Sequence, residues 1–228
     1  ELILVARSAD RLAAVASDIE DRGGRAHALP ANLSRPDAVA DMAQAALGTV
    51  GTPDIIINNA GAGRWLSVME TSPEEARAMI ELPYLAAFAV TRAFLPSMLA
   101  RASGSIVNVT SPASYLAWPD AAAYIAARHA LKGFSEALRL EVAPHGIGVG
   151  LVVLGTVESS YWAHNPGSRE RVPKGGAPLT TDQAAQTIVD AVARDRRLTI
   201  RPALFRLLIA LETLAPGLTA RGRRSAPA

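Results

Sequence analysis

The sequence predicts an α/β fold, in which a doubly wound parallel sheet is flanked by helices. Short apolar runs alternate with stretches of helical length, a pattern typical of βαβ units. The runs are apolar throughout, as expected of strands that are buried on both faces. Half of the 228 residues are hydrophobic and only 5% are aromatic. We expect one domain over residues 1–201, followed by an apolar helix and a basic tail over residues 202–228.

The apolar runs predict six strands, over residues 1–6, 26–29, 54–58, 106–109, 147–153 and 198–200. Helical spacing and helix-start residues predict helices over residues 10–22, 34–47, 72–100, 120–143, 183–194 and 202–214. Ser34 and Thr181-Asp182 are expected to cap their helices, because short polar side chains accept bonds from free backbone N–H groups. Residues 154–178 should form a loop, and the chain from Arg221 onward should be disordered.

The helix over residues 72–100 has a strong start signal. Ser72 is a capping residue, Pro73 fits the first helical position, and two glutamates follow where the helix dipole favours negative charge. Pro83 and Pro96 lie inside this predicted helix.

Composition excludes several functional classes. The chain has no cysteine, which excludes disulfides, zinc–cysteine sites and a thiol nucleophile. Its four histidines lack metal-ligand spacing, so no metal site is predicted. The net charge is only +2, but eight arginines and two acids lie between Arg194 and Arg224. Such an end can contact anionic lipid or nucleic acid. We favour a solvated end and predict no nucleic-acid partner, with a weak membrane-surface contact through residues 202–228 as the alternative.

One stretch contains a serine, a tyrosine and a cation at spacings that suit acid–base chemistry. Ser111 follows the strand over residues 106–109, Tyr124 lies thirteen positions later, and Arg128 follows Tyr124 by four. Residues four apart on a helix share one face, so Arg128 should lie beside the phenol. Free tyrosine has a pKa near ~10, and a neighbouring cation lowers it by roughly 1–3 units. The spacing therefore predicts a tyrosine that can act as an acid or base.

This stretch, together with NNAG at residues 58–61, resembles the short-chain dehydrogenase/reductase family, whose active site reads Ser and then Tyr-x-x-x-Lys. The resemblance implies a Rossmann-type sheet and hydride transfer between a nicotinamide and a carbonyl or secondary alcohol of an apolar small molecule. Tyr124 would exchange the proton and Ser111 would bond the carbonyl oxygen. Arg128 stands in the lysine position. The family also implies a homodimer or homotetramer, and we expect a cytoplasmic protein because no signal peptide is evident.

The cofactor residues follow in part from position and in part from the resemblance. Arg7 and Ser8 end the first predicted strand, where a cation favours the 2′-phosphate of NADP over the free ribose of NAD. We therefore predict NADP, with NAD as the less favoured alternative. The resemblance adds further cofactor-contacting positions: Asn32, Leu33, Asn59, Ala60, Gly61, Tyr124, Arg128, Gly155 and Val157. Asn59 would also stabilise the central strands.

Three departures from the family pattern qualify this reading. No glycine-rich turn follows the first strand, so we expect the chain to lack the family's first strand and phosphate-binding loop. Pro83 falls where the family has an asparagine that holds a relay water, and Arg128 replaces the lysine at the other end of that relay. A catalytically impaired dinucleotide-binding or regulatory protein is therefore the alternative. Lys132 cannot easily substitute, because eight helical positions span about 12 Å.

Two further features bear on substrate access. The resemblance also favours Ser111 over Ser114 as the active-site serine, because the spacing from Ser111 to Tyr124 matches that of the family. The loop with Tyr161, Trp162 and His164 would cover the substrate as a lid. Trp65, Trp118 and Trp162 then suggest that the entrance to the substrate site is apolar.

Overall fold

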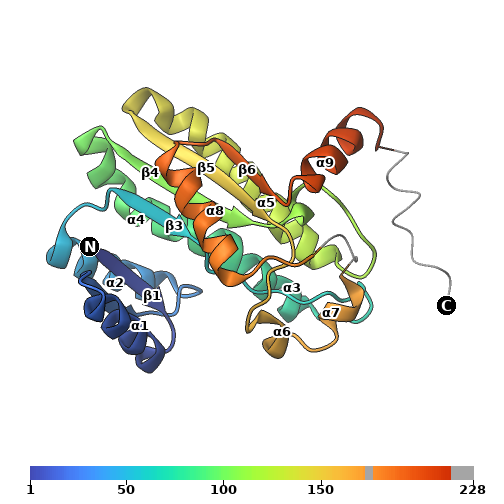
Figure 1. Cartoon of the computed structure of the whole chain (residues 1–228), viewed down its shortest axis with the longest axis horizontal. Helices are drawn as coiled ribbons and strands as arrows, with labels where there is room; N and C mark the ends of the chain where they lie inside the picture. The colour runs from blue at the N-terminus through green and yellow to red at the C-terminus, as the bar shows by residue number, and fades with distance from the viewer. Residues whose placement is uncertain (173–176, 217–228) are drawn as a thin grey trace.

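The computed structural model describes residues 1–172 and 177–216 (Figure 1). The strands are β1 (Leu2–Ala6), β2 (Ala26–Pro30), β3 (Ile55–Asn58), β4 (Gly104–Thr110), β5 (Ile147–Leu154) and β6 (Leu198–Arg201). The longer helices are α1 (Ala9–Asp21), α2 (Pro36–Val50), α3 (Pro73–Ile80), α4 (Ala86–Arg101), α5 (Ala122–Val142), α8 (Thr181–Ala193) and α9 (Leu204–Leu214). All six strands were predicted. The disorder predicted from Arg221 onward lies outside the described residues.

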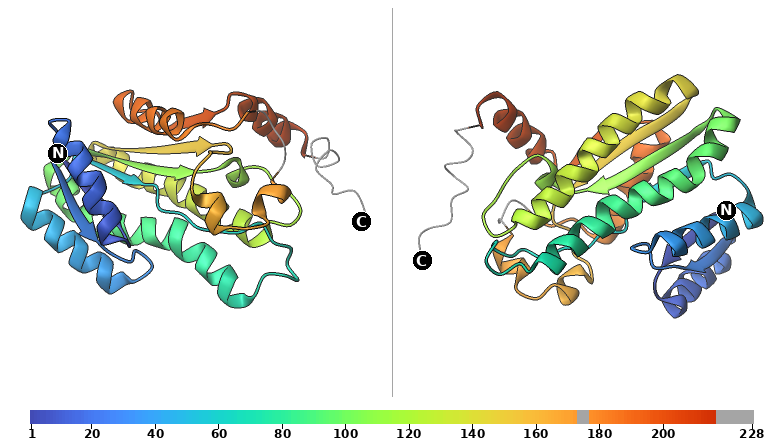
Figure 2. Two further views of the ribbon diagram at one scale, coloured as in Figure 1. Left: turned by 60° about the horizontal axis from the view of Figure 1, so that its bottom comes forward. Right: turned by 180° about the vertical axis from the view of Figure 1, so that it is seen from behind.

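The strands form parallel ladders, as the apolar runs predicted. Four of them pair in the order β3-β4-β5-β6, and β1 pairs with β2 in a separate two-stranded sheet. The two-stranded sheet lies next to the β3 edge (Figure 2). Ile3 and Val5 of β1 pack against the same core cluster that contains Ile56 of β3. The doubly wound α/β fold is therefore confirmed, although among the described residues β1 and β3 share no ladder.

Helices cover both faces of the four-stranded sheet, with α8 in front of it and α4 and α5 behind it in Figure 1. Alternate residues of β4 point to opposite faces. Ile106 packs with α2, α4 and α5 in one core cluster, whereas Val107 and Val109 pack with α8 in another. Burial on both faces explains why the strands are apolar without alternation.

Helix α3 begins as predicted, because Ser72 and Glu75 form a reciprocal capping box. A π-helical turn, Glu81–Leu85, joins α3 to α4 and contains Pro83, which is buried. A wider turn accommodates a proline that cannot donate a hydrogen bond and clashes with the preceding turn of an α-helix. The continuous stretch Pro73–Arg101 is long and apolar enough to cross a membrane by length and composition alone. However, Phe94 and Met98 of this stretch are buried in the core.

Two predicted helix caps are wrong by one residue. Arg35, not Ser34, is the N-cap of α2, with φ −110° and ψ 116°. The residue before a proline is driven to extended backbone, and Pro36 occupies the first helical position. At α8 the cap is Thr180, which forms a capping box with Gln183, so the predicted Thr181-Asp182 pair already lies inside the helix.

The predicted loop over residues 154–178 contains two short helices, α6 (Tyr161–His164) and α7 (Ser168–Arg171). A single helical turn is too short to produce the periodic apolar pattern from which helices are predicted. Residues 173–176 of that loop lie outside the described residues. The bridge between Val157 and Leu179 brings the two ends of the loop together beside α8.

Candidate active site

The candidate site forms where β4 ends and α5 begins. Ser111 follows β4 in extended backbone, and its side chain accepts a bond from the N–H of Ala113. Tyr124 lies in the first turn of α5, and its hydroxyl donates to Oγ of Ser111 at 3.3 Å. The loop between them returns the chain to the same edge of the sheet, which brings together two side chains thirteen positions apart. Both residues line one cavity.

Arg128 lies beside Tyr124, as the four-residue spacing predicted. Its guanidinium carbon is 4.8 Å from the centre of the Tyr124 ring, and Nη2 donates to the carbonyl of Ala62 at 3.3 Å. The side chain is only 8% exposed. A Cβ at Gly61 would lie 3.2 Å from Nη2, so this glycine leaves room for the guanidinium. Within residues 1–172 and 177–216, Nε of Arg128 has no hydrogen-bond acceptor.

Ser114 and Lys132 have other partners. Ser114 is fully buried, where its hydroxyl bonds Oγ1 of Thr110 at 2.6 Å and donates to the carbonyl of Arg128 at 3.1 Å. It therefore ties the loop after β4 to α5. Lys132 pairs with Glu136 at 2.9 Å and lies over the ring of Tyr115. This geometry leaves Ser111 as the serine that contacts Tyr124.

A cavity of about 820 Å³ extends from this cluster. Part of the predicted set lines it: Asn59, Gly61, Ser111, Tyr124, Arg128, Gly155 and Val157, together with Ser159. The remaining predicted residues lie elsewhere. Arg7 and Ser8 are exposed in the turn from β1 to α1, and Asn32 and Leu33 follow β2. Ala60 is exposed and does not line the cavity. The structure thus separates the prediction into a cavity group, a group at the ends of β1 and β2, and Ala60, which follows β3.

Aromatic side chains form one wall of the cavity. The Trp65 ring lies 5.8 Å from the Tyr124 ring and 6.0 Å from the Trp118 ring, measured between centroids. Trp162 also lines the cavity, and its Nε1 donates to the carbonyl of Val157 at 2.9 Å. Trp65 is 6% exposed, so it packs as a wall and not as a rim residue. His164, predicted in the lid, is absent from the lining, and its ring lies within 2.7 Å of the carbonyl of Ser160.

The strand-bridging asparagine is Asn58 and not, as expected, Asn59. Asn58 Nδ2 donates to Oδ1 of Asn108 at 2.8 Å, and Nδ2 of Asn108 donates to Oγ of Ser135 at 2.8 Å. Asn108 and Ser135 are fully buried, and this chain links β3, β4 and α5 beneath the site. Asn59 follows the end of β3 and is exposed. An asparagine inside the apolar run IVNVT was the available signal for this network.

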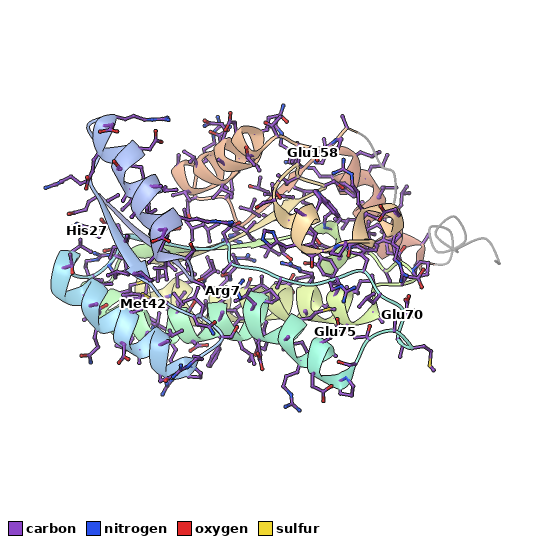
Figure 3. The ribbon with its side chains drawn as sticks, turned by 90° about the horizontal axis from the view of Figure 1, so that it is seen from below. Arg7, His27, Met42, Glu70, Glu75 and Glu158 are labelled. Carbon is purple, nitrogen blue, oxygen red and sulfur yellow. The ribbon has the colours of Figure 1, made fainter. Side chains whose placement is uncertain are left out.

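Acidic and cationic groups around the site are few. Among the described residues no group of three or more potential metal ligands comes together. Burial raises the pKa of the Tyr161 phenol, and the nearby Tyr124 adds to the increase. At the outer edge, the Arg171 guanidinium holds the pKa of the Glu70 carboxyl well below its usual range. Arg7, at the end of β1, is well separated from Glu70 in Figure 3.

The parallel sheet and the Ser–Tyr–Arg cluster at the carboxyl ends of its strands define a Rossmann-type α/β protein of the dehydrogenase class. Residues 1–169 match the family model for short chain dehydrogenases. The chain belongs to the short-chain dehydrogenase/reductase family.

Comparison with individual known proteins also finds dehydrogenases and oxidoreductases. The chain is 31% identical over 196 residues to dehydrogenase/reductase SDR family member 7B of Bos taurus, covering 82% of this chain and 59% of that protein. It is 36% identical over 202 residues to an uncharacterised oxidoreductase of Mycobacterium tuberculosis, covering 86% and 58%. A short-chain dehydrogenase from Sphingobium yanoikuyae in complex with NADPH has a TM-score of 0.80 at 26% identity, covering 99% of this chain and 88% of that one. The chain therefore spans less than two thirds of the length of these two curated relatives.

Proposed function

We propose that the protein is an NADP(H)-dependent oxidoreductase acting on a carbonyl or secondary alcohol of an apolar small molecule. The observation that carries the proposal is the contact of Ser111, Tyr124 and Arg128 at one end of a largely apolar cavity. A tyrosine hydroxyl bonded to a serine hydroxyl, with a cation against its ring, can exchange a proton with a carbonyl oxygen. Apolar and aromatic walls suit a substrate without charge.

The residues present fit a nicotinamide dinucleotide. Gly61 and Gly155 line the cavity, and the unsatisfied Nε of Arg128 is a buried donor that a ribose hydroxyl can satisfy. Arg7 and Ser8 would hold the 2′-phosphate at the end of β1, and Asn32, Leu33 and Ala60 would border the adenosine half. The NADPH complex of the Sphingobium relative supports NADP for this chain, with NAD as the alternative. A bound nicotinamide supplies or accepts the hydride.

The side chains of the protein then transfer the proton. Ser111 donates to the substrate oxygen and orients it toward Tyr124. Tyr124 gives its hydroxyl proton to that oxygen during reduction and accepts one during oxidation. Arg128 stabilises the phenolate that results, because its positive charge lies against the ring. Pro83 has no polar side-chain group and no N–H that could hold a relay water. Tyr124 therefore recovers its proton from water in the open cavity.

Tyr124→Phe tests this assignment, because it removes one oxygen and keeps the ring stacked on Trp65. NADPH oxidation would be followed across a panel of apolar aldehydes and ketones, and NADPH binding by fluorescence titration. We expect turnover to fall by at least about 100-fold while NADPH affinity stays within about twofold. Turnover that survives this change would refute the role of Tyr124. NADPH binding without turnover in the unmodified chain would instead favour a catalytically impaired dinucleotide-binding protein.

Several broader assignments stay predictions. We propose a cytoplasmic homodimer or homotetramer with a small-molecule substrate and no nucleic-acid partner. The division into residues 1–201 and 202–228 is likewise proposed, with α9 as the first element of the second part.

A second candidate role, contact with an anionic membrane surface, is favoured by the outer side of α9. Four leucines with spacings of three, four and three residues share this side and are 42–83% exposed: Leu204, Leu207, Leu211 and Leu214. The opposite side carries Phe205 and Leu208, which line the cavity. Arg201 and Arg206 are exposed near the start of the helix. Exposed leucines beside cations fit an interface of acyl chains and acidic headgroups.

Co-sedimentation with phosphatidylserine-containing vesicles tests this contact. Leu207→Glu with Leu211→Glu should abolish binding, whereas the control Val68→Glu changes a residue that is 71% exposed outside α9 and should leave binding unchanged. Unchanged sedimentation of the α9 variant would reject the membrane contact. A loss of self-association in that variant, without any vesicle binding by the unmodified chain, would reject it in favour of a second copy of the chain.

A further inference from the structure

Three contacts join the segment over residues 161–172 to the segment over residues 63–70. The Tyr161 hydroxyl donates to the carbonyl of Gly63 at 2.5 Å, and the backbone N–H of Trp65 donates to Oγ of Ser168 at 3.0 Å. The guanidinium of Arg171 forms two bonds with the Glu70 carboxylate, at 2.5 and 2.7 Å. The contacts follow the same order along both segments. Residues about 100 positions apart are thereby held side by side.

The 63–70 segment also forms part of the surroundings of Tyr124. Gly63 is buried and lies directly against the Tyr124 ring, since a Cβ on this glycine would be 2.6 Å from Cδ2 of that ring. The Trp65 ring, from the same segment, contacts the Tyr124 ring in a tilted arrangement. Two of the three contacts therefore end on backbone groups, at Gly63 and Trp65, that position the ring of Tyr124.

The three contacts differ in strength because they differ in exposure. Arg171 and Glu70 form an exposed pair, and such pairs contribute little to stability. Ser168 is 1% exposed, and the Tyr161 hydroxyl meets its acceptor in a partly buried site. Removing a partner from a buried hydrogen bond leaves the other group unsatisfied and costs the penalty of desolvation. Tyr161 and Ser168 therefore carry most of the attachment.

We infer that Tyr161 and Ser168 are positioning residues, which hold the Gly63–Trp65 backbone against Tyr124 and so orient its hydroxyl toward Ser111. This inference rests on the proposed role of Tyr124 as the acid/base. Neither residue is required to touch the substrate's reacting atoms, and each acts through the segment that it fixes. Their removal should reduce turnover more than cofactor affinity and should also release the 161–172 segment.

The test combines limited proteolysis with kinetics on Tyr161→Phe and Ser168→Ala. Trypsin cleavage after Arg169 and Arg171 reports opening of the 161–172 segment, and cleavage after Arg22 at the exposed end of α1 is the internal reference. Loss of a buried hydrogen bond should raise the relative cleavage about 5-fold or more. We expect kcat to fall at least about 10-fold, with NADPH affinity unchanged, because small displacements near a reacting group reduce rates steeply.

Two variants serve as controls. Tyr115→Phe removes the hydroxyl of another partly buried tyrosine, which lies outside both segments, and should change neither readout. Glu70→Gln weakens the exposed pair with Arg171 and keeps a side-chain oxygen for the exposed N–H of Ser67, so it should raise cleavage less than about 2-fold. Unchanged cleavage and kcat in Tyr161→Phe and Ser168→Ala would overturn the inference, as would increased cleavage with unchanged kcat. An unmodified chain that turns over no carbonyl compound refutes the proposed function instead, and the proteolysis result remains interpretable by itself.

Discussion

Gly63→Ala tests how tightly the candidate site is packed. Gly63 has a φ of +138°, a backbone conformation that residues with a side chain rarely adopt. A Cβ at this position would lie 2.6 Å from Cδ2 and 3.2 Å from Cε2 of Tyr124. Carbon atoms in favourable contact are about 3.5–4.0 Å apart, so the ring or the loop must move by about 1 Å.

The expected loss has two parts. Backbone strain contributes about 1–3 kcal/mol and the steric conflict another ~1–3 kcal/mol, so the free energy of unfolding should fall by roughly 2–6 kcal/mol. A displacement of about 1 Å near the reacting group should also reduce kcat by about 100-fold. Urea denaturation followed by circular dichroism measures the first quantity, and NADPH-dependent turnover measures the second.

Gly23→Ala is the matched control. Gly23 also has a positive φ, +80°, but a Cβ there has no neighbour within 4 Å. Only the backbone strain remains, about 1–2 kcal/mol, and turnover should not change. In a Tyr124→Ala background, the stability cost of Gly63→Ala should shrink by about 1–3 kcal/mol, because the clash has been removed. Equal losses for Gly63→Ala and Gly23→Ala, or an unchanged cost in that background, would refute the packing argument.

Two other predictions concern the polar contacts. Asn108→Leu should lower the free energy of unfolding by about 2–4 kcal/mol in urea denaturation, because it removes the acceptor of the Asn58 side chain and the donor to the buried Ser135 hydroxyl. A change under about 0.5 kcal/mol would contradict the network. Arg171 lowers the pKa of Glu70 in the folded state, so the bonds of that carboxylate stabilise the fold above the unfolded pKa of about 4.3 and are lost as pH falls toward the folded value. The difference in free energy of unfolding between the unmodified chain and Glu70→Gln would be measured by denaturation at each pH. It should be constant above about pH 4.5 and decline below it. A difference that does not change with pH would exclude the linkage.

Local sequence patterns were sufficient where the geometry is set within one element. The four-residue spacing of Tyr124 and Arg128 predicted their contact, and the helix geometry alone explains it. Ser72 likewise predicted the start of α3. The cap of α2 was predicted at the wrong residue because Ser34 was weighed by type, whereas Pro36 constrains the backbone of its neighbour.

Contacts between distant segments were less accessible. Asn58 and Asn59 are adjacent and of the same type, and only the register of β3 against β4, which pairs Asn58 with Asn108, decides which one reaches it. Nothing in the chain around Ser168 indicates that its hydroxyl accepts a bond from the backbone of Trp65.

The sequence by itself therefore determined the α/β class, the family resemblance and the triplet of Ser111, Tyr124 and Arg128, because each depends on periodicity or spacing along a short stretch. The tertiary structure decided which predicted residues share the cavity and which residues hold the Tyr124 ring in place. Those choices depend on how strands, helices and loops pack around one sheet, and that packing joins segments about 100 residues apart through contacts that no local pattern records.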